Sequence, residues 1–564
     1  MDITSRKSLL GKVFRSTALC CKRSRSLGVS ALLIGSFFAA GHVSEINAAN
    51  PAPRNPHLAD STNPIGHTTS AQQDSVPQAG PIGPTRTLDD FELQYRHFGP
   101  FQFGTSISGV YPDGKRVFWS NGANGVFKAE HDSFNIIDRF PVEGKEFSRP
   151  EIESALEELR SREGLSAMYF AFKQADMFKE LSGVYTLLDN NHDYYIGDNG
   201  GRGITVYGDA DPSDSNSKIV KKRQWTMPDS VSGLMIGMNM TFDGWIVFAT
   251  EHGYIVSVKK DFSEERVVRL NYAVEEDAEN AATGPTGKGW VRNGQAVDES
   301  GIYVASQNHM HKVIWQNEQL SVDEKDGAWS VQYSNTAGQG TGSTPSLMGF
   351  GDEDQFVVIT DGDKKMNLLL YWRNEIPADW KKLPEANDRR VAGIIRVDMG
   401  DPELAVQSEQ SVVVSGYGAA MVNNTPRMPW YYPERAAMLL NGFLGTREEY
   451  QPYGIQKFAW NPEKRQLENA WVNTSLSSPN AMPLVSAGSN ILYTTGARNG
   501  EWTLEGIDWT TGEPVFHYVL GDERYNTLFA GVLLDEDGHI FFGTSFGKVR
   551  LKPRKEEVLN TASN

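Results

Sequence analysis

Cysteine is almost absent from this sequence. Among 564 residues the only cysteines are Cys20 and Cys21, and both precede an apolar run at residues 27–40. Small residues at Ala48 and Ala49 offer a cleavage site after that run. A chain cleaved there keeps no cysteine, so it forms no disulfide and cannot hold a c-type haem through Cys-x-x-Cys-His.

An excess of positive charge is also missing. The sequence has 54 Lys and Arg against 71 Asp and Glu, a net charge of −17. Nucleic acids and anionic membranes are bound by basic faces, so this balance argues against both as partners. The apolar run at 27–40 has about fourteen residues, fewer than the roughly twenty that span a bilayer. We therefore predict no transmembrane span after signal cleavage.

The two ends of the chain and the segment at 50–88 differ in composition from the rest. Basic residues before the run at 27–40 predict a signal peptide over residues 1–49 and a periplasmic or secreted protein. Residues 50–88 are rich in Pro, Ser, Gln and Gly and poor in large apolar residues, which predicts a disordered linker. Residues 556–564 are predicted to be a tail.

A repeat dominates residues 89–555. An apolar strand, a turn of Asp, Gly, Asn or Ser, and a second and third strand recur, as in "MTFDGWIVFATEHGYIVSVKKD" from Met240 and "LLDEDGHIFFGTSFGKVRLK" from Leu533. Contiguous copies recur every fifty residues or so, the period of four-stranded propeller blades. Seven copies are explicit, and the interval between Trp372 and Val485 has room for one more. The pattern predicts an all-β fold, a β-propeller of eight four-stranded blades, with seven as the alternative.

Two insertions interrupt the repeat. Residues 148–183 have helical periodicity, and Ser148 with Glu151 forms a capping-box pattern at their start. Their second half is more apolar than one packing stripe requires. This apolar surplus predicts that the insertion forms a rim of the channel mouth and contacts an amphipathic substrate or a partner protein. The alternative is that its apolar side chains pack onto the blade edges. A second insertion at about 425–450 has the same aromatic and apolar character.

The last blades resemble a known family. The stretch "GIDWTTGEPVFHYVLG" followed by "DEDGHIFFGTSFG" looks like the repeat of quinoprotein alcohol dehydrogenase-like propellers. The resemblance implies that Asp508, Thr511, Gly512 and Phe516 hold adjacent blades together. Classical members place a cysteine pair over pyrroloquinoline quinone (PQQ), and the mature chain has no cysteine, so PQQ is the less favoured cofactor.

A weaker likeness lies at "WVRNGQAVDESGIYVAS", which is similar to the inner-strand start of gluconolactonase and strictosidine-synthase-like propellers. That family binds a divalent cation at the channel mouth, and Asn293 and Gly294 match its pattern directly. Asn239 and Asn480 sit at comparable places, and Glu251 is the carboxylate expected to face the channel. These oxygen donors predict a calcium site, whereas turn-capping asparagines are the structural alternative.

Turn geometry predicts a second set of site residues. In a four-stranded blade the loop before the innermost strand and the turn between the second and third strands emerge on one face. Polar residues in those turns should therefore converge at the mouth as candidates for binding a polar or anionic ligand. They are Asp198, Arg202, His252, His309, Asp361 and Arg498. His309 and His311 could chelate Zn²⁺ or Cu²⁺, or be solvated turn histidines.

No His-Glu-x-x-His or Gly-Lys-Ser/Thr phosphate motif occurs in the sequence, so the usual support for zincins and nucleotide binders is missing. Three hypotheses remain. The first is an exported monomeric propeller that binds a small molecule or a periplasmic protein at the channel mouth, without chemistry. The others are a quinone-dependent oxidoreductase and a metal-dependent hydrolase or lactonase. Whether the protein is an enzyme stays open.

Overall fold

The computed structural model describes residues 50–558, with gaps at 99–103, 123, 143–147, 176–184, 199, 274–289, 339, 407, 409, 428–436 and 528. The chain separates into residues 1–47 and 48–564, and every described residue belongs to the second unit. The predicted signal peptide and most of the predicted tail lie outside the described residues.

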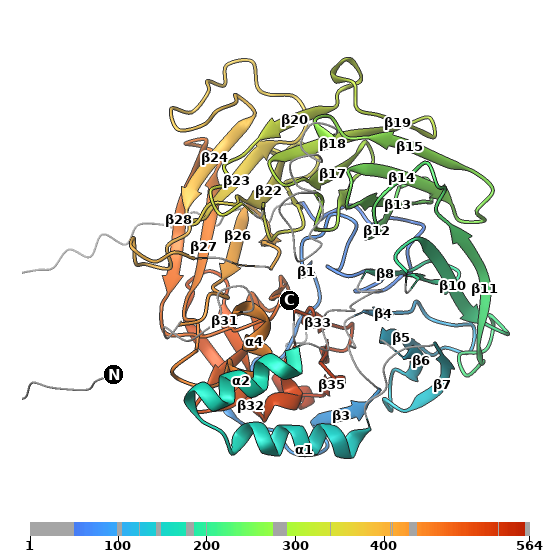
Figure 1. The fold of residues 1–564 in the computed structure, drawn as a ribbon, viewed down its shortest axis with the longest axis vertical. Coiled ribbons are helices and arrows are strands. Elements are labelled where there is room, and N and C mark those ends of the chain that lie inside the picture. Colours follow the sequence, from blue (N-terminus) through green and yellow to red (C-terminus); the bar gives the residue numbers. More distant parts are fainter. Residues whose placement is uncertain are drawn as a thin grey trace, which may run out of the picture. The chain divides into compact units, whose positions relative to one another are not determined.

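The described residues form eight sheets, each with four strands of a propeller blade (Figure 1). We number the blades 1 to 8 in chain order and give their strands from the channel outward. Blades 1 to 4 consist of β4 (Thr105–Ile107), β5 (Val117–Gly122), β6 (Gly125–Glu130) and β7 (Ile136–Pro141); β8 (Thr186–Leu188), β9 (Tyr194–Gly197), β10 (Gly203–Asp209) and β11 (Ile219–Thr226); β12 (Met235–Met240), β13 (Trp245–Thr250), β14 (Tyr254–Lys259) and β15 (Glu265–Arg269); and β16 (Ala296–Val297), β17 (Gly301–Ala305), β18 (His309–Gln316) and β19 (Gln319–Ser321), with β20 (Trp329–Gln332) also paired to β18.

Blades 5 to 8 complete the ring. They consist of β21 (Ser346–Met348), β22 (Phe356–Thr360), β23 (Asn367–Trp372) and β24 (Val391–Arg396); β25 (Val413–Ser415), β26 (Gly418–Val422), β27 (Ile455–Asn461) and β28 (Gln466–Asn473); β29 (Leu484–Ser486), β30 (Ile491–Arg498), β31 (Glu501–Asp508) and β32 (Pro514–Gly521); and β33 (Leu533–Leu534), β34 (Ile540–Gly543), β35 (Gly547–Leu551) and β3 (Leu93–His97). The all-β propeller predicted from the repeat is confirmed, with eight blades rather than seven. The missing copy between Trp372 and Val485 is blade 6.

Burial explains the strand pattern. All six residues of β13, which reads Trp-Ile-Val-Phe-Ala-Thr, are buried, because both faces of the strand pack against neighbouring blades. The outermost β7 has no buried residue. Inner strands therefore need continuous β-branched and aromatic residues, whereas outer strands tolerate polar ones.

The first strand of the ring region closes the last blade, as predicted. β3 pairs antiparallel with β35, with Leu93 opposite Leu551 and His97 opposite Gly547. This pairing covers the outer edge of β35 with a strand that is remote in sequence. It removes an exposed sheet edge that would otherwise pair with other chains.

The Asp-Thr-Gly turn holds blade 7 against blade 6, in the role that the family resemblance implies. The Asp508 carboxylate accepts hydrogen bonds from the backbone N–H of Thr510 and Thr511. Gly512 has φ +77°, and a side chain there would strike the Trp471 ring at 2.5 Å. The Trp471 indole in turn donates to the Trp509 carbonyl at 3.0 Å. Glycine is needed both for its backbone conformation and for this close approach.

Residues 50–88 are ordered, which corrects the predicted disordered linker. Near their end β2 (Arg86–Thr87) pairs with the outer edge of β32, and β1 (Ser75–Val76) pairs parallel with the channel edge of β29. Between residues 55 and 76, which we name the channel segment, the chain crosses the middle of the ring (Figure 1).

The channel segment hydrogen-bonds to every blade. Its backbone carbonyls accept from Ile107, Leu188, Val297, Leu347, Val414 and Val485 in blades 1, 2, 4, 5, 6 and 7, at 2.7–2.9 Å. Blade 3 donates through the Asn239 amide to the Ser70 carbonyl, and the Asn63 amide donates to the Leu534 carbonyl of blade 8. A low apolar content predicts disorder because no core can form. Here the inner strand edges supply backbone partners instead, in a channel that suits small polar residues.

Two insertions supply helices. α1 (Arg149–Arg160) and α2 (Gly164–Ala175) connect blade 1 to blade 2, and the predicted capping box is present at Ser148 and Glu151. α4 (Ala437–Leu444) lies between β26 and β27 and packs against α2. No helix within the described residues has the length and apolar character needed to cross a membrane. The remainder of each insertion, at 176–183 and 428–436, lies outside the described residues.

Candidate functional site

The innermost strands all begin on one face of the propeller, which we name the mouth face. Register places the turn between the second and third strands on the same face, since Met235 at the start of β12 pairs with Thr250 at the end of β13. Thr105 likewise pairs with Ser120, and Thr186 with Ile196. This geometry agrees with the expectation from the repeat.

A cavity of about 160 Å³ lies where the innermost strands begin. Gly66 and His67 of the channel segment line it, and the remaining lining comes from blades 1, 2 and 4 to 8. Hydrogen-bonding side chains around it are Thr105, Thr186, Asn293, Thr344, Gln410 and Ser411. Met482, Phe529 and Leu533 supply an apolar wall. Among the described residues that line the cavity, none has a charged Asp, Glu, Lys or Arg side chain.

Gln410 is exceptional among these lining residues. Its side chain is 1% exposed, and neither its amide nitrogen nor its amide oxygen has a hydrogen-bond partner. A buried polar group without a partner costs about 1–3 kcal/mol, so native structures avoid it unless water or a ligand satisfies the group. The other lining groups are engaged: Ser411 accepts from the Thr344 N–H at 3.1 Å, and the Asn293 amide donates to the Thr341 carbonyl at 2.9 Å.

His67 is held in place within the channel segment. Its Nδ1 lies 2.8 Å from Asp74 Oδ2, and both side chains are buried. His67 has φ 69° and Asp74 has φ 54°, so the backbone adopts left-handed conformations at both residues. The pair fixes the loop of the segment that closes the cavity on the channel side.

Six residues predicted to bind a ligand lie outside the lining of this cavity, and each contacts its own turn or connection. The Asp198 carboxylate accepts from the Arg202 N–H at 3.0 Å. The Arg202 guanidinium donates to the carbonyls of Val231 and Gly233. His252 Nδ1 lies 2.9 Å from the Ser232 hydroxyl.

The other three ligand candidates are similarly occupied. Arg498 donates two hydrogen bonds to the Glu505 carboxylate. Asp361 accepts from the Asn367 N–H and side-chain amide, and burial raises the pKa of its carboxyl to about 6. The His309 ring stacks on Tyr272 with centroids 4.4 Å apart.

In the predicted histidine chelate, both ring nitrogens of His311 already contact hydroxyl groups. His311 Nε2 and Nδ1 lie 2.8 Å from the hydroxyls of Ser306 and Ser330, and burial lowers the pKa of its imidazole to about 3. His309 and His311 have ring centroids 5.8 Å apart. Both His311 nitrogens are therefore bonded to hydroxyls, as in a structural histidine.

The four predicted calcium ligands have separate sets of partners. Asn239 is fully buried, its oxygen accepts from the Met240 N–H, and its amide donates to the carbonyls of Ser70 and Gln295. Glu251 accepts from the Leu234 N–H, and burial raises the pKa of its carboxyl. Asn480 accepts from the Thr527 hydroxyl at 3.2 Å. Asn293 is the only one of the four that lines the cavity.

Within the described residues no hydrogen bond joins two of these four side chains, and the Asn239 oxygen already has a donor. Calcium binding by this set stays a prediction. The described residues also contain no cysteine pair of the kind that covers PQQ in classical members, and the chain's own segment crosses the channel below the mouth.

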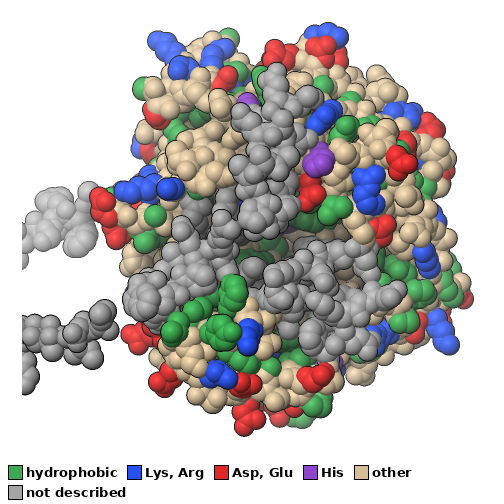
Figure 2. All heavy atoms as spheres, in the orientation of Figure 1, with side chains coloured by type: hydrophobic (Ala, Val, Ile, Leu, Met, Phe, Trp, Pro, Cys, Tyr) green, Lys and Arg blue, Asp and Glu red, His purple; other side chains and the backbone are tan. Residues whose placement is uncertain are grey.

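The helices cover neighbouring turns of the mouth face. Ile152 and Leu156 of α1 pack against Phe546 in the turn between β34 and β35. Arg447, after α4, donates to the carbonyls of Leu159 and Arg162. On α2 the side chains of Leu165, Tyr169 and Phe172 are about half exposed, and Figure 2 shows hydrophobic side chains gathered there. Their expected contact with a substrate or partner stays a prediction.

The sequence reasoning missed Gln410 and His67. His67 lies in the segment taken as a linker, so no repeat register applied to it. Thr105, Thr186 and Thr344 stand at or just before the start of an innermost strand. Alignment of the blade copies at that position would have shown recurring hydroxyl residues, which is a signal for a polar ring around the channel.

The fold and the threaded channel define the class of this protein: an eight-bladed β-propeller whose own N-terminal segment crosses the channel below a small polar cavity. Comparison with known proteins gives a relative in Archaeoglobus fulgidus, an uncharacterized protein that is 31% identical over 567 residues, covering 96% of this chain and 99% of the relative. The chain belongs to the family of that protein. No protein-family model matches the chain.

Solved structures with a similar fold include two quinohemoprotein alcohol dehydrogenases. The one from Comamonas testosteroni has a TM-score of 0.48 at 13% identity, with 89% of this chain and 82% of that chain covered. Enzyme ADHIIG from Pseudomonas putida HK5 has a TM-score of 0.46 at 12% identity, covering 88% and 77%. The Dos1 propeller has a TM-score of 0.43 at 10% identity, covering 82% and 96%. The predicted likeness to quinoprotein propellers is confirmed as a likeness of fold, and similarities this weak say nothing about cofactor or activity.

Proposed function

We propose that this protein is an exported β-propeller that binds a small, neutral, polar molecule in the cavity at its channel mouth. The observation that carries the proposal is the Gln410 amide, which is buried beside the cavity with both polar atoms unpaired. A carboxamide offers one acceptor and two donors to a ligand. The basic and apolar segments of residues 1–49 support export.

The lining favours a neutral ligand. Hydroxyl and amide groups can bind alcohols and amides, whereas an anion or cation would lack a countercharge in the lining and lose its hydration. Lys548, whose Nζ donates to the Gly104 carbonyl and the Thr105 hydroxyl beside the cavity, is fully buried, and burial holds its pKa well below the usual range. This replaces the expectation of a polar or anionic ligand held by charged turn residues.

The size of the cavity limits the ligand. Pockets for drug-sized molecules have volumes of about 300–1,000 Å³, and this one has about 160 Å³. A ligand of roughly the size of a small polyol fits that space. No observation within the described residues specifically favours a quinone-dependent oxidoreductase or a metal-dependent hydrolase.

Acetamide and acetate make a sharp test, because they have the same shape and differ in charge. Binding to the full chain would be measured by ligand-observed NMR at millimolar concentration, with glycerol as a third probe. We expect acetamide and glycerol to bind and acetate not to bind. Equal binding of acetate would overturn the neutral-ligand proposal, and so would the absence of binding by any of the three.

Variants locate the site. Gln410→Met removes the unpaired amide at nearly constant volume and should abolish acetamide binding. His252→Gln changes a polar side chain on the mouth face outside the cavity and should leave binding unchanged. Retained binding in Gln410→Met, with loss in His252→Gln, would move the site to the turn residues.

A further inference from the structure

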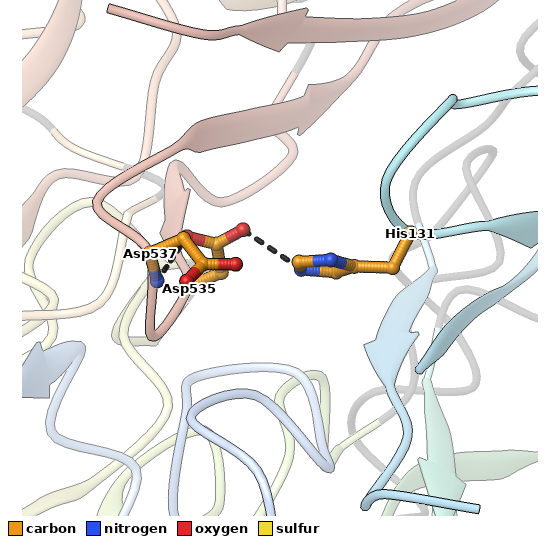
Figure 3. Close-up of side chains that lie close together, drawn as sticks. All are labelled: His131, Asp535 and Asp537. Atoms are coloured by element: carbon orange, nitrogen blue, oxygen red, sulfur yellow. Dashed lines mark hydrogen bonds and ion pairs between the residues drawn. The ribbon is translucent and has the colours of Figure 1, made fainter. Parts of the chain in front are cut away.

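A second cluster of ligating side chains lies away from the mouth face. His131 follows β6 in the turn that leads to β7 of blade 1, and Asp535 and Asp537 belong to the turn between β33 and β34 of blade 8 (Figure 3). His539 lies in the same turn of blade 8. These two turns belong to the first and last blades, which become neighbours only when the ring closes. The cluster therefore sits at the closing junction.

Three polar atoms converge in this cluster. His131 Nε2 lies 2.8 Å from Asp535 Oδ2, and His539 Nδ1 lies 3.2 Å from the same oxygen. Ligand atoms of His131, Asp535 and Asp537 all lie within 4.8 Å of one another. Apart from these two ion-pair contacts, the three atoms Nε2, Nδ1 and Oδ2 are buried and have no further hydrogen-bond partner. Figure 3 shows the His131 ring pointing toward the two carboxylates.

The surrounding contacts hold the cluster in place. Asp535 Oδ1 accepts from the N–H groups of Asp537 and His539, so only Oδ2 faces His131. The His131 ring stacks on Phe118 with centroids 5.1 Å apart. Its Nδ1 lies 3.3 Å from Asp132 Oδ1. A carboxylate on Nδ1 places the proton there and leaves the Nε2 lone pair for a metal, a common arrangement behind metal-binding histidines.

The donor set selects the metal. One imidazole nitrogen with two carboxylates suits divalent transition metals, and Zn²⁺ in particular takes three such protein ligands in a tetrahedron that water completes. Metal–ligand bonds of about 2.0–2.1 Å place tetrahedral ligand atoms ~3.3 Å apart. The present separation of 2.8 Å between His131 Nε2 and Asp535 Oδ2 needs to widen by only a few tenths of an ångström. Two carboxylates would also neutralise the charge of the ion.

We propose that His131, Asp535 and Asp537 bind one divalent transition-metal ion, Zn²⁺ by preference, which joins blade 8 to blade 1, and that His539 holds the Asp535 carboxylate in position. The pairing of β3 with β35 closes the same blade at its outer edge. The metal would add a second closure between blades. Asp537 is exposed and His539 is partly exposed, so the ion has a path from solvent.

The test uses the full chain, stripped of metal by dialysis against a chelator. Isothermal titration calorimetry with Zn²⁺, and with Ca²⁺ for comparison, would give stoichiometry and affinity, and thermal unfolding would be followed in parallel. We expect one Zn²⁺ per chain, a melting temperature that rises until one equivalent is bound, and no such rise with Ca²⁺. Absence of stoichiometric Zn²⁺ binding would overturn the proposal.

Two variants test the proposed site. Asp537→Asn and His539→Gln change partly or fully exposed residues, so both variants should fold. Asp537→Asn removes a ligand and should weaken Zn²⁺ binding at least tenfold, and His539→Gln, which loses the contact with Asp535 Oδ2, should weaken it as well. Asp352→Asn is the matched control, because Asp352 is an exposed carboxylate in the corresponding turn of blade 5. Wild-type affinity in both cluster variants would overturn the proposal. So would equal weakening in Asp352→Asn, since that would indicate unspecific binding to acidic turns.

Discussion

Because the Gln410 amide is unpaired, its replacement by an apolar residue should stabilise the fold, which is the opposite of the usual effect. A buried glutamine normally stabilises the fold through its hydrogen bonds, and its replacement by an apolar residue destabilises the protein. In Gln410→Met the side chain keeps a similar length, and no bond to a described group is lost. Removal of the unsatisfied amide should therefore raise the free energy of unfolding of the ligand-free protein, by up to about 2 kcal/mol. Water in the cavity would offset part of this gain.

Gln456 provides the matched comparison. It is also 1% exposed, but its side-chain oxygen accepts from the N–H groups of Asp398 and Met399 at 3.1 and 2.9 Å. Gln456→Met leaves the buried N–H of Met399 and the partly buried N–H of Asp398 without a partner. The free energy of unfolding of this variant should fall by about 1–3 kcal/mol.

Urea unfolding followed by tryptophan fluorescence would compare the midpoints of wild type and both variants. The midpoint should rise or stay constant in Gln410→Met and should fall in Gln456→Met. A comparable fall in both would mean that Gln410 has partners in the folded chain. The argument for a ligand site beside it would then fail.

Three further predictions concern the ring. A chain that begins at Thr87 lacks the channel segment, so it should unfold at lower urea concentration and aggregate more than one that begins at Asn50; equal midpoints would mean that the segment does not stabilise the ring. In Arg86→Met the buried carboxylates of Glu92 and Glu557 lose the guanidinium that bridges them at 2.6 and 2.8 Å. The free energy of unfolding at pH 7 should therefore fall by about 3–5 kcal/mol. A fall below about 1 kcal/mol, measured by urea unfolding, would contradict this. Burial raises the pKa of Asp361 from 3.8 to about 6, so the folded state holds that proton more tightly and stability should fall by up to about 3 kcal/mol as pH rises from about 4 to 6. Asp361→Asn should lack that slope, and identical pH profiles of the two proteins would refute the assignment.

The local pattern of the sequence was enough to predict the blades. Strand-turn-strand copies, the Asp508 turn and the Ser148 capping box each depend on residues close together in the chain, and the structure has all three. Closure by β3 was also predictable, because the last copy lacks its fourth strand and an unpaired strand precedes the first copy.

Residues that depend on distant neighbours were beyond sequence reasoning. Asn239 and Arg202 are polar turn or strand residues like many others, and only the folded ring shows that the first binds the channel segment and the second holds a connection between blades. The same holds for Asp535 and His131, which are about 400 positions apart in sequence and meet only through ring closure.

The sequence by itself determined the repeat, the number of blades to within one blade, and the polarity of the turns. These features are local, because the strands of each blade pair mainly with one another. Only the tertiary structure decided what fills the channel. Residues 55–76 have too few apolar side chains to fold alone, and they become ordered because eight inner strands, brought together by the ring, present hydrogen-bonding partners to them.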